Sequence, residues 1–372
     1  MMHKIDARMV VPETAASEQP TLPSPPPGWG AAPPPSEADV RLAAESGFGC
    51  LSAHVVGAAV RLGVLDAIAE TGTTSDEVAD ACGAQPRAMR RLMRALVGLG
   101  FLEAKGDAYH LTTAARLVRR SNPMSLAPII SFMTEPFTVR AWEGLTEAVR
   151  TGEPVFASYF GKPFFEYLED DDAFAKRFNE GMTLMGGFQP LEHMYDFSRF
   201  KNIVDVGGGE GALLSRIMTK NPMIHGTVLD TEAAIIKARE VMASANVADR
   251  FTGKVGDFFQ AVPKGGDLYM MKGILHDWSD DKATEILRTV RAAMTPDSQL
   301  LLIEGVIDDA GLEAERTQYL MDLNMLVNFG GTERTADEHR ALLAAAGVQP
   351  PSFNYAPPPL GIAFIEARPA NR

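Results

Sequence analysis

From Lys201 onward, short apolar runs alternate with amphipathic segments, and this alternation leaves few architectures open to the chain. The runs with the character of buried strands are 203–206, 226–229, 268–271 and 300–303. Strands that alternate with helices pair in parallel, and their crossovers cover both faces of the sheet with helices. A last pair of runs, around 352–354 and 361–365, is expected to close the sheet as a hairpin. The sequence therefore predicts an α/β fold with a doubly wound, Rossmann-like sheet.

The part of the chain before this alternation has a mostly helical pattern. Thr74 and Glu77 have the spacing of a capping box, in which Thr74 caps a helix and Glu77 reaches back to it. Pro86 opens a further helix, and residues 101–111 have the pattern of a hairpin that turns at 105–107. Helix, helix and hairpin in this order predict a winged helix.

Composition divides the chain into three parts. Residues 1–38 are rich in proline and have little apolar surface to bury, so we expect a disordered tail, to which we assign no function. Residues 39–192 are expected to form the helical, winged-helix domain. Residues 193–372 are expected to form the sheet domain.

Charge and cysteine content exclude several classes of protein. The net charge is 35 − 48 = −13, which disfavours nucleic acid as a partner because phosphate binding needs a basic face. Two cysteines, Cys50 and Cys82, exclude a disulfide framework and fit a reducing compartment. No apolar run is long enough to span a bilayer, and the first residues lack the apolar stretch of a secretory signal. We therefore expect a cytoplasmic protein without a membrane partner.

A glycine-rich turn is the sharpest local motif in the chain. Asp205 and Gly207 to Gly211 follow a buried strand and precede the predicted helix 212–220. Glycines at Gly207 and Gly209 let the backbone approach a ligand at the carboxyl edge of the sheet. Asp230 follows the next strand, where its carboxylate could accept hydrogen bonds from both hydroxyls of a ribose. The same spacing also satisfies the dinucleotide fingerprint, so a nicotinamide oxidoreductase remains an alternative.

Three features favour S-adenosylmethionine over a nicotinamide cofactor. Asp205 can help to orient a ligand that bears an ammonium and a sulfonium, whereas an acidic loop repels a pyrophosphate. Asp257 and Phe258 follow the third strand, where the acid could reach the adenine amino group and the aromatic ring could lie beside the base. The sheet domain is also C-terminal to a helical domain.

A histidine follows the fourth strand of the sheet and is the candidate general base. His276 comes after Gly273 and therefore lies at the edge that carries the cofactor. A phenol has a pKa of about 10 and a free imidazole about 6.5, so full proton transfer before attack is uphill by roughly 5 kcal/mol. A carboxylate beside the imidazole reduces that gap, and Glu304 and Glu333 are the two candidates. Asp277 is expected to cap the following helix.

Together these motifs resemble the class I S-adenosylmethionine-dependent methyltransferases of the caffeate and acetylserotonin O-methyltransferase type, in particular the bacterial branch that acts on secondary metabolites. The resemblance covers roughly residues 43–368 and is carried by the segments 204–209, 256–259, 276–280 and 330–335. It implies a seven-stranded sheet preceded by a winged-helix dimerisation domain. It also implies a metal-independent transfer of methyl to a hydroxyl, expected to be phenolic, on a small aromatic natural product.

The same resemblance implies roles for individual residues. It makes His276 the general base, oriented by Glu304 and Glu333. It gives cofactor contacts at Gly207, Asp230, Asp257, Phe258 and Lys272, and substrate-facing positions at Phe178, Met182, Met325 and Asn328. It further implies a homodimer in which helices of one subunit line the pocket of the other.

Two other functions remain open alternatives. Relatives of this type include proteins that keep the cofactor site but hydroxylate or decarboxylate their substrate. A DNA-binding regulator is the second, because the helix from Pro86 carries four arginines, Arg87, Arg90, Arg91 and Arg94, where a winged helix contacts phosphates.

Overall fold

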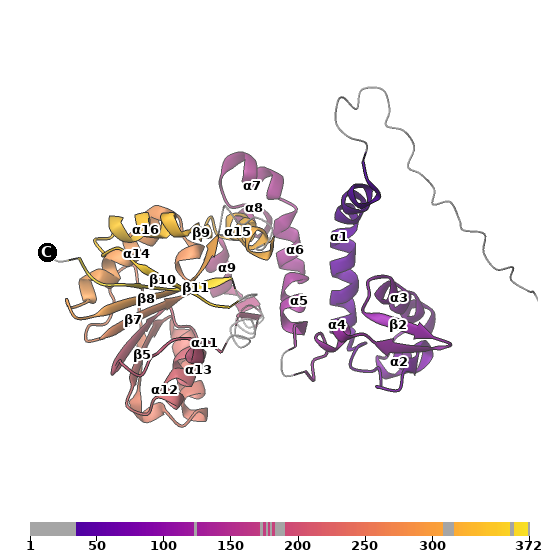
Figure 1. Cartoon of the computed structure of the whole chain (residues 1–372), viewed down its shortest axis with the longest axis horizontal. Helices are drawn as coiled ribbons and strands as arrows, with labels where there is room; N and C mark the ends of the chain where they lie inside the picture. The colour runs from indigo at the N-terminus through magenta and orange to yellow at the C-terminus, as the bar shows by residue number, and fades with distance from the viewer. Residues whose placement is uncertain are drawn as a thin grey trace, which may run out of the picture.

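The computed structural model describes residues 35–122, 125–171, 174–175, 178, 181–182, 190–307, 316–357 and 361–370. Figure 1 shows two bodies, an N-terminal helical one and a C-terminal one built on a sheet, with further helices between them. The predicted tail lies almost entirely outside the described residues. The first helix, α1 (Glu37–Leu62), begins with Ser36 as its cap and includes the last two residues that we had assigned to the tail.

The N-terminal body is the predicted winged helix. Thr74 caps α2 (Ser75–Ala81) in a capping box, and its backbone N–H donates to Glu77 Oε2 at 2.8 Å. Pro86 opens α3 (Pro86–Gly98), and the hairpin follows as β2 (Leu102–Lys105) and β3 (Ala108–Leu111). The short strand β1 (Thr73–Thr74) pairs with β3, and α4 (Thr113–Arg116) follows. The buried faces of α1, α2 and α3 share one hydrophobic core.

Short helices rich in aromatic residues connect this body to the sheet. They are α5 (Ala127–Met133), α6 (Pro136–Trp142), α7 (Leu145–Thr151), α8 (Phe156–Phe160), α9 (Phe164–Asp170) and α11 (Leu191–Met194). Phe156 and Phe164 are buried at their centre, with ring centroids 5.0 Å apart. The domain division that we placed after residue 192 falls within α11.

The sheet has the predicted doubly wound topology. Its strand order is β10-β11-β8-β7-β4-β5-β6, and the two-residue strand β9 (Arg334–Thr335) pairs with β8 as an addition to the seven predicted. Strands β4 to β8 are parallel, whereas β10 and β11 form the predicted antiparallel hairpin. The bounds are β4 (Asn202–Val206), β5 (His225–Asp230), β6 (Phe251–Val255), β7 (Leu268–Lys272), β8 (Gln299–Ile307), β10 (Ser352–Tyr355) and β11 (Ile362–Ala367).

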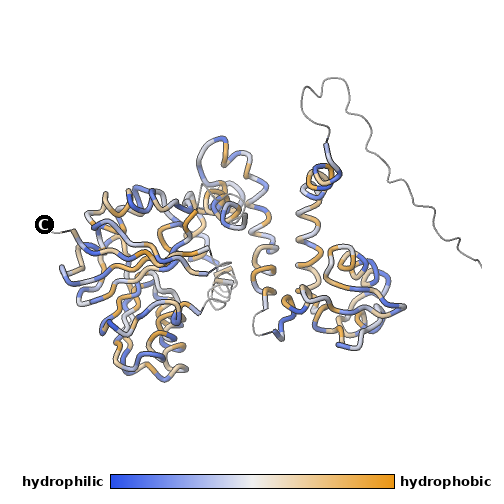
Figure 2. Tube along the Cα trace, viewed as in Figure 1, coloured by the Kyte–Doolittle hydropathy of each residue, from blue (hydrophilic) through white to orange (hydrophobic). Residues whose placement is uncertain are grey.

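Helices cover both faces of the sheet. Alternate residues of β7 point to opposite faces: Tyr269 and Met271 join one core, and Leu268 and Met270 the other. The first core is closed by α14 (Asp280–Ala293) and α16 (Ala336–Ala345), and the second by α12 (Ala212–Lys220) and α13 (Glu232–Ser244). Figure 2 shows hydrophobic segments along these strands. Helix α15 (Arg316–Asn328) instead packs on α6 and α7. The 3₁₀ turns η1 (Ala248–Arg250) and η2 (Leu275–Asp277) complete the fold.

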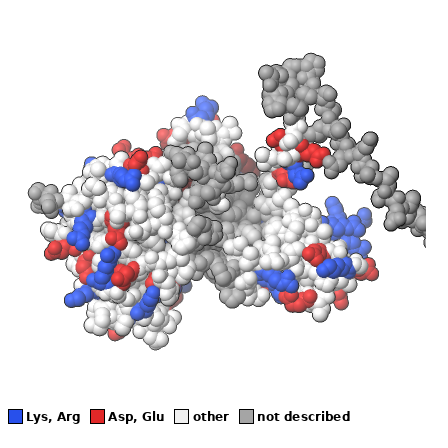
Figure 3. Space-filling model, viewed as in Figure 1, with Lys and Arg blue, Asp and Glu red and all other residues white. Residues whose placement is uncertain are grey.

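The surface carries charges of both signs. Figure 3 shows basic side chains gathered on the N-terminal body, and the four arginines of α3 are exposed there. Arg90 pairs with Asp76 at 3.2 Å. Among the helices that the structure describes, none is both long and apolar enough to cross a bilayer.

Candidate active site

The glycine-rich turn lies at the carboxyl end of β4 and is tied to the end of β5. Gly209 N–H donates to Asp230 Oδ2 at 2.8 Å. The turn is therefore in contact with Asp230, the acid that we expect to bind a ribose, as predicted from their positions after neighbouring strands. Gly207 has φ +71°, and a Cβ there would lie 2.5 Å from Ile274 Cδ1. A side chain is therefore excluded at Gly207 by both conformation and space. Ile274 precedes η2, so the turn packs directly on the segment that carries His276.

The base of this turn holds buried negative charge. Asp205 is 3% exposed, and burial, together with the charge of Asp230, raises its pKa to about 7. Lys272, at the end of β7, opposes this shift. Burial lowers the pKa of Lys272, while the charges of Glu304 and Asp205 raise it. A ligand that brings positive charge fits this environment, whereas a pyrophosphate does not.

Asp257 and Phe258 follow β6 at the same sheet edge. Asp257 Oδ1 accepts from Phe259 N–H at 2.8 Å and Oδ2 from the Gln260 amide at 3.1 Å, and the residue is exposed. The Phe258 ring lies 3.6 Å from the position of a Cβ on Gly207. The Phe258 ring therefore lies beside the glycine-rich turn, and each Asp257 oxygen retains a further lone pair for a ligand.

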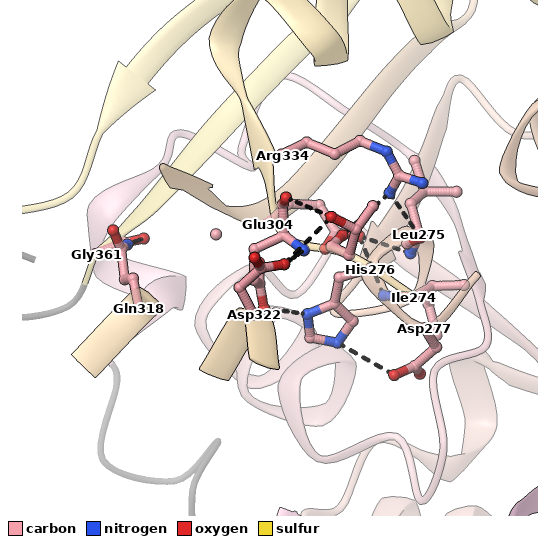
Figure 4. Close-up of polar contacts among 12 residues, drawn as sticks. Ile274, Leu275, His276, Asp277, Glu304, Gln318, Asp322, Arg334 and Gly361 are labelled. Carbon is pink, nitrogen blue, oxygen red and sulfur yellow. Dashed lines mark hydrogen bonds and ion pairs between the residues drawn. The ribbon is translucent and has the colours of Figure 1, made fainter. Parts of the chain in front are cut away.

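His276 lies in η2, and its ring is held by a carboxylate. His276 Nδ1 is 2.8 Å from Glu333 Oε1, and Nε2 is 3.6 Å from Asp277 Oδ1. Figure 4 shows the imidazole with Asp277 beside it. Burial alone would lower the pKa of His276, but the carboxylates of Asp277, Glu333 and Glu304 outweigh it and raise the pKa to about 10. In the neutral ring, the hydrogen on Nδ1 bonds to Glu333 and leaves the lone pair on Nε2, which is the arrangement of a general base.

The two predicted glutamates hold His276 in different ways. Glu333 contacts the ring, whereas Glu304 Oε1 accepts from the backbone N–H groups of Ile274 and Leu275, both at 3.0 Å. Glu304 therefore fixes the turn, and Glu333 fixes the imidazole within it. Asp277 does not cap α14: that cap is Ser279, and burial raises the pKa of Asp277 to about 7 beside His276.

Sequence reasoning missed the part played by Arg334, which is 2% exposed. Its guanidinium donates to the carbonyls of Leu275 and Trp278, each at 2.8 Å, and pairs with Asp280 at 2.8 Å. These contacts clamp both ends of the turn that carries His276. The sequence did offer a hint of this role. Arg334 directly follows Glu333, so if Glu333 reaches His276 at the sheet edge, Arg334 must lie near that edge as well.

The four predicted substrate-facing residues are placed at different depths. Phe178 and Met182 are half-buried in the aromatic cluster between the two bodies. Met325 is 4% exposed and Asn328 is 6% exposed. The Asn328 amide donates to the carbonyl and to Oδ1 of Asn324, each at 3.0 Å. Met325 and Asn328 therefore have packing and hydrogen-bonding roles within α15 itself.

A cluster of aromatic rings that the sequence did not reveal lies beside η2, the turn that carries His276. The half-buried Phe165 of α9 stacks on Trp278, with ring centroids 5.4 Å apart and planes at 12°. Phe329 lies 5.6 Å from Phe165, and Phe259 contacts the edge of Trp278. Flat apolar ligands fit against such a surface. Among the described residues, no group of three or more His, Cys, Asp or Glu side chains could hold a metal ion.

Family models match two parts of the chain. The model described as an O-methyltransferase domain covers residues 142–349, and the model of an O-methyltransferase dimerisation domain covers residues 45–121. The first range runs from the last residue of α6 to just after α16 and ends before β10, and the second runs from within α1 to just after α4.

Individual relatives agree with these matches. The chain is 36% identical over 328 residues to O-demethylpuromycin-O-methyltransferase of Streptomyces alboniger, covering 87% of each protein. Human N-acetylserotonin methyltransferase in complex with S-adenosylmethionine has a TM-score of 0.79 at 26% identity, covering 91% of this chain and 99% of the human one. Aclacinomycin 10-hydroxylase of Streptomyces purpurascens is 33% identical over 302 residues, covering 78% of this chain and 79% of the hydroxylase.

Proposed function

This chain belongs to the O-methyltransferase family and uses S-adenosylmethionine, and from this premise we propose that it methylates a phenolic hydroxyl of a small aromatic natural product with His276 as the general base. The supporting observation is the contact of His276 Nδ1 with Glu333 at 2.8 Å, because it leaves Nε2 as the basic nitrogen.

The residues around the glycine-rich turn fit the cofactor. Asp205 supplies buried negative charge for its cationic groups, and the half-buried Asp230 offers carboxylate oxygens to its ribose hydroxyls. Gly207 admits the cofactor where any side chain would collide with Ile274. Bound S-adenosylmethionine supplies a methyl group on a positively charged sulfur, which is open to in-line attack by an oxygen. We propose cofactor contacts at Asp205, Gly207, Gly209, Asp230, Asp257, Phe258 and Lys272.

The pKa of His276 supports a phenol as the acceptor. A phenol has a pKa of about 10, and the carboxylates around His276 raise its pKa to about 10 as well. The raised pKa reduces the free-energy cost of moving a proton from a phenol to His276, so the base can take the proton as the oxygen attacks. The new positive charge on the ring is stabilised by Glu333, while Glu304 prevents the turn from moving.

The cluster of aromatic rings beside η2 supports a flat acceptor. Phe165 and Trp278 stack next to η2, and Phe178 and Met182 extend the apolar surface from the helices of residues 39–192. We propose that these helices line the acceptor pocket and that residues 193–372 bind the cofactor. We also propose a homodimer, because α1 exposes Leu42, Phe48 and Leu51 and the chain carries a dimerisation domain.

The function is tested with the purified full chain and S-adenosylmethionine carrying a labelled methyl group, offered a panel of phenols and naphthols. We expect label in an ether product, and His276→Ala should lower turnover about 10²- to 10⁴-fold while binding of S-adenosylhomocysteine persists. His225→Ala, at an exposed position where β5 begins, is the matched control. Full turnover by His276→Ala would refute the base, and a hydroxylated or decarboxylated product without label would indicate the other chemistry.

A further inference from the structure

The segment that carries Glu333 lies between the catalytic turn and α15. On one side, Thr332 N–H donates to the carbonyl of His276 at 2.9 Å. A Cβ on Gly331 would lie only 2.0 Å from that same carbonyl oxygen, so backbone rests directly on backbone here. On the other side, the segment contacts one side chain of α15, Asp322.

Asp322 holds this segment through two hydrogen bonds. Its Oδ1 accepts from the backbone N–H of Glu333 at 2.9 Å and from Thr332 Oγ1 at 3.2 Å. Asp322 is half-buried, and Figure 4 shows it close to His276 and Glu304. Glu333 is therefore fixed at both ends, by Asp322 at its backbone and by His276 at its carboxylate.

The electrostatics of this position are unfavourable for an acid. Burial raises the pKa of Asp322, and the charges of Glu333 and Glu338 raise it further, while the hydrogen bonds from Glu333 N–H and Thr332 lower it. The carboxylates that raise the pKa of His276 are those of Asp277, Glu333 and Glu304. What Asp322 provides is thus an acceptor that a helix holds in place.

We propose that Asp322 is a positioning residue for the catalytic base, which it serves by fixing the backbone of Glu333 so that the carboxylate stays on His276 Nδ1. This inference rests on the proposed role of His276. The link to the imidazole is indirect and passes through Glu333, whereas Thr332 connects Asp322 to the backbone carbonyl of His276. Loss of the acceptor at position 322 should therefore weaken the Glu333–His276 contact and leave the cofactor turn unaffected.

Two substitutions separate the acceptor from the charge. Asp322→Asn retains an oxygen that can accept both hydrogen bonds, so kcat should stay within about 3-fold of the parent. Asp322→Leu has a similar size but no acceptor, and kcat should fall about 10-fold with the KM for S-adenosylmethionine unchanged. The acidic limb of the pH profile should also move to lower pH in Asp322→Leu, because His276 loses part of its carboxylate partner. Asp337→Leu, whose parent side chain is 92% exposed, is the matched control.

A double-mutant cycle tests whether Asp322 acts through Glu333. In the Glu333→Gln background, Asp322→Leu should cost less than about 2-fold in kcat. An equal loss in both backgrounds, or an unchanged kcat and pH limb in Asp322→Leu, would overturn the proposal. If Asp322→Leu does not fold, Asp322→Ala, which adds no bulk, is measured in its place. The turnover of His276→Ala tests separately whether His276 is the general base. Failure of the proposed function is therefore distinguishable from failure of this inference.

Discussion

Glu333→Gln is the substitution that most directly probes the proposed base, because it keeps the shape of the side chain and removes its charge. The amide oxygen can still accept from His276 Nδ1, so the ring should keep its orientation. What is lost is the charge-assisted part of the 2.8 Å contact. A hydrogen bond to a charged group contributes about 1.5–3 kcal/mol, which corresponds to about 1–2 pKa units.

The direction of the effect follows from the protonation of the ring. Protonated His276 cannot accept a proton, so the rate rises with pH through the pKa of His276 in the complex with cofactor and acceptor, a pKa that the neighbouring carboxylates raise. Removal of the Glu333 charge favours the neutral ring, so the acidic limb should move to lower pH by about 1–2 units. The plateau rate should fall by about 10- to 100-fold, because the imidazolium that forms during transfer loses the same stabilisation.

The assay is the initial rate of methyl transfer between about pH 6 and pH 10, at saturating cofactor and acceptor. The same acceptor is used for both enzymes, so that its own ionisation contributes equally to the two profiles. Glu304→Gln is the informative comparison, since Glu304 bonds to backbone N–H groups and not to the ring. A limb that stays in place or moves to higher pH in Glu333→Gln would refute the assignment of Glu333 as the partner of His276.

Three further substitutions test the surroundings of the site. Gly331→Ala should lower kcat about 10- to 100-fold with unchanged affinity for S-adenosylhomocysteine, because the added Cβ would displace the backbone of His276. Steady-state kinetics measures the first quantity and calorimetry the second, and an unchanged kcat would contradict the prediction. Arg334→Leu should lower the free energy of unfolding by about 2–4 kcal/mol in denaturant titrations, because the carbonyls of Leu275 and Trp278 lose their donors. Asp205→Asn should raise the thermal midpoint of the ligand-free protein above pH 7 and reduce the shift caused by S-adenosylmethionine. The pKa of Asp205 in the folded protein, about 7, exceeds that of the free acid, so ionisation of Asp205 lowers the free energy of unfolding as the pH rises. The amide of Asn does not ionise and avoids this loss.

Local signals in the sequence were sufficient for the elements that position the site. The capping box at Thr74 and Glu77, the helix 212–220 and the hairpin at 101–111 are present as predicted. The glycine-rich turn could be placed at the sheet edge because it directly follows a buried strand. Each of these depends on residues close together in the chain, where periodicity, glycine and proline have direct meaning.

The contacts that hold His276 could not be predicted in the same way. Arg334 reaches the carbonyls of residues 56 and 59 positions earlier, and Glu304 reaches backbone N–H groups about 30 positions earlier. Asp277 has the sequence context of a helix cap, but the cap is Ser279, and the Asp277 carboxylate turns to the imidazole. Burial and pairing of this kind are set by tertiary packing, which leaves no periodic trace in the sequence.

The charges of the site suggest why a histidine with so many acidic neighbours can act as a base. Asp277, Glu304 and Glu333 raise the pKa of His276, which suits it to a phenol but also favours its protonated form in the ligand-free protein. The negative charge of Asp205, buried at the glycine-rich turn, favours a cationic ligand there. Positive charge bound there disfavours a second positive charge on His276, so the ring should release its proton when the cofactor binds and regain one from the acceptor during transfer. The carboxylates around His276 therefore serve the transfer step, because they stabilise the imidazolium that forms as the positive charge on sulfur is lost.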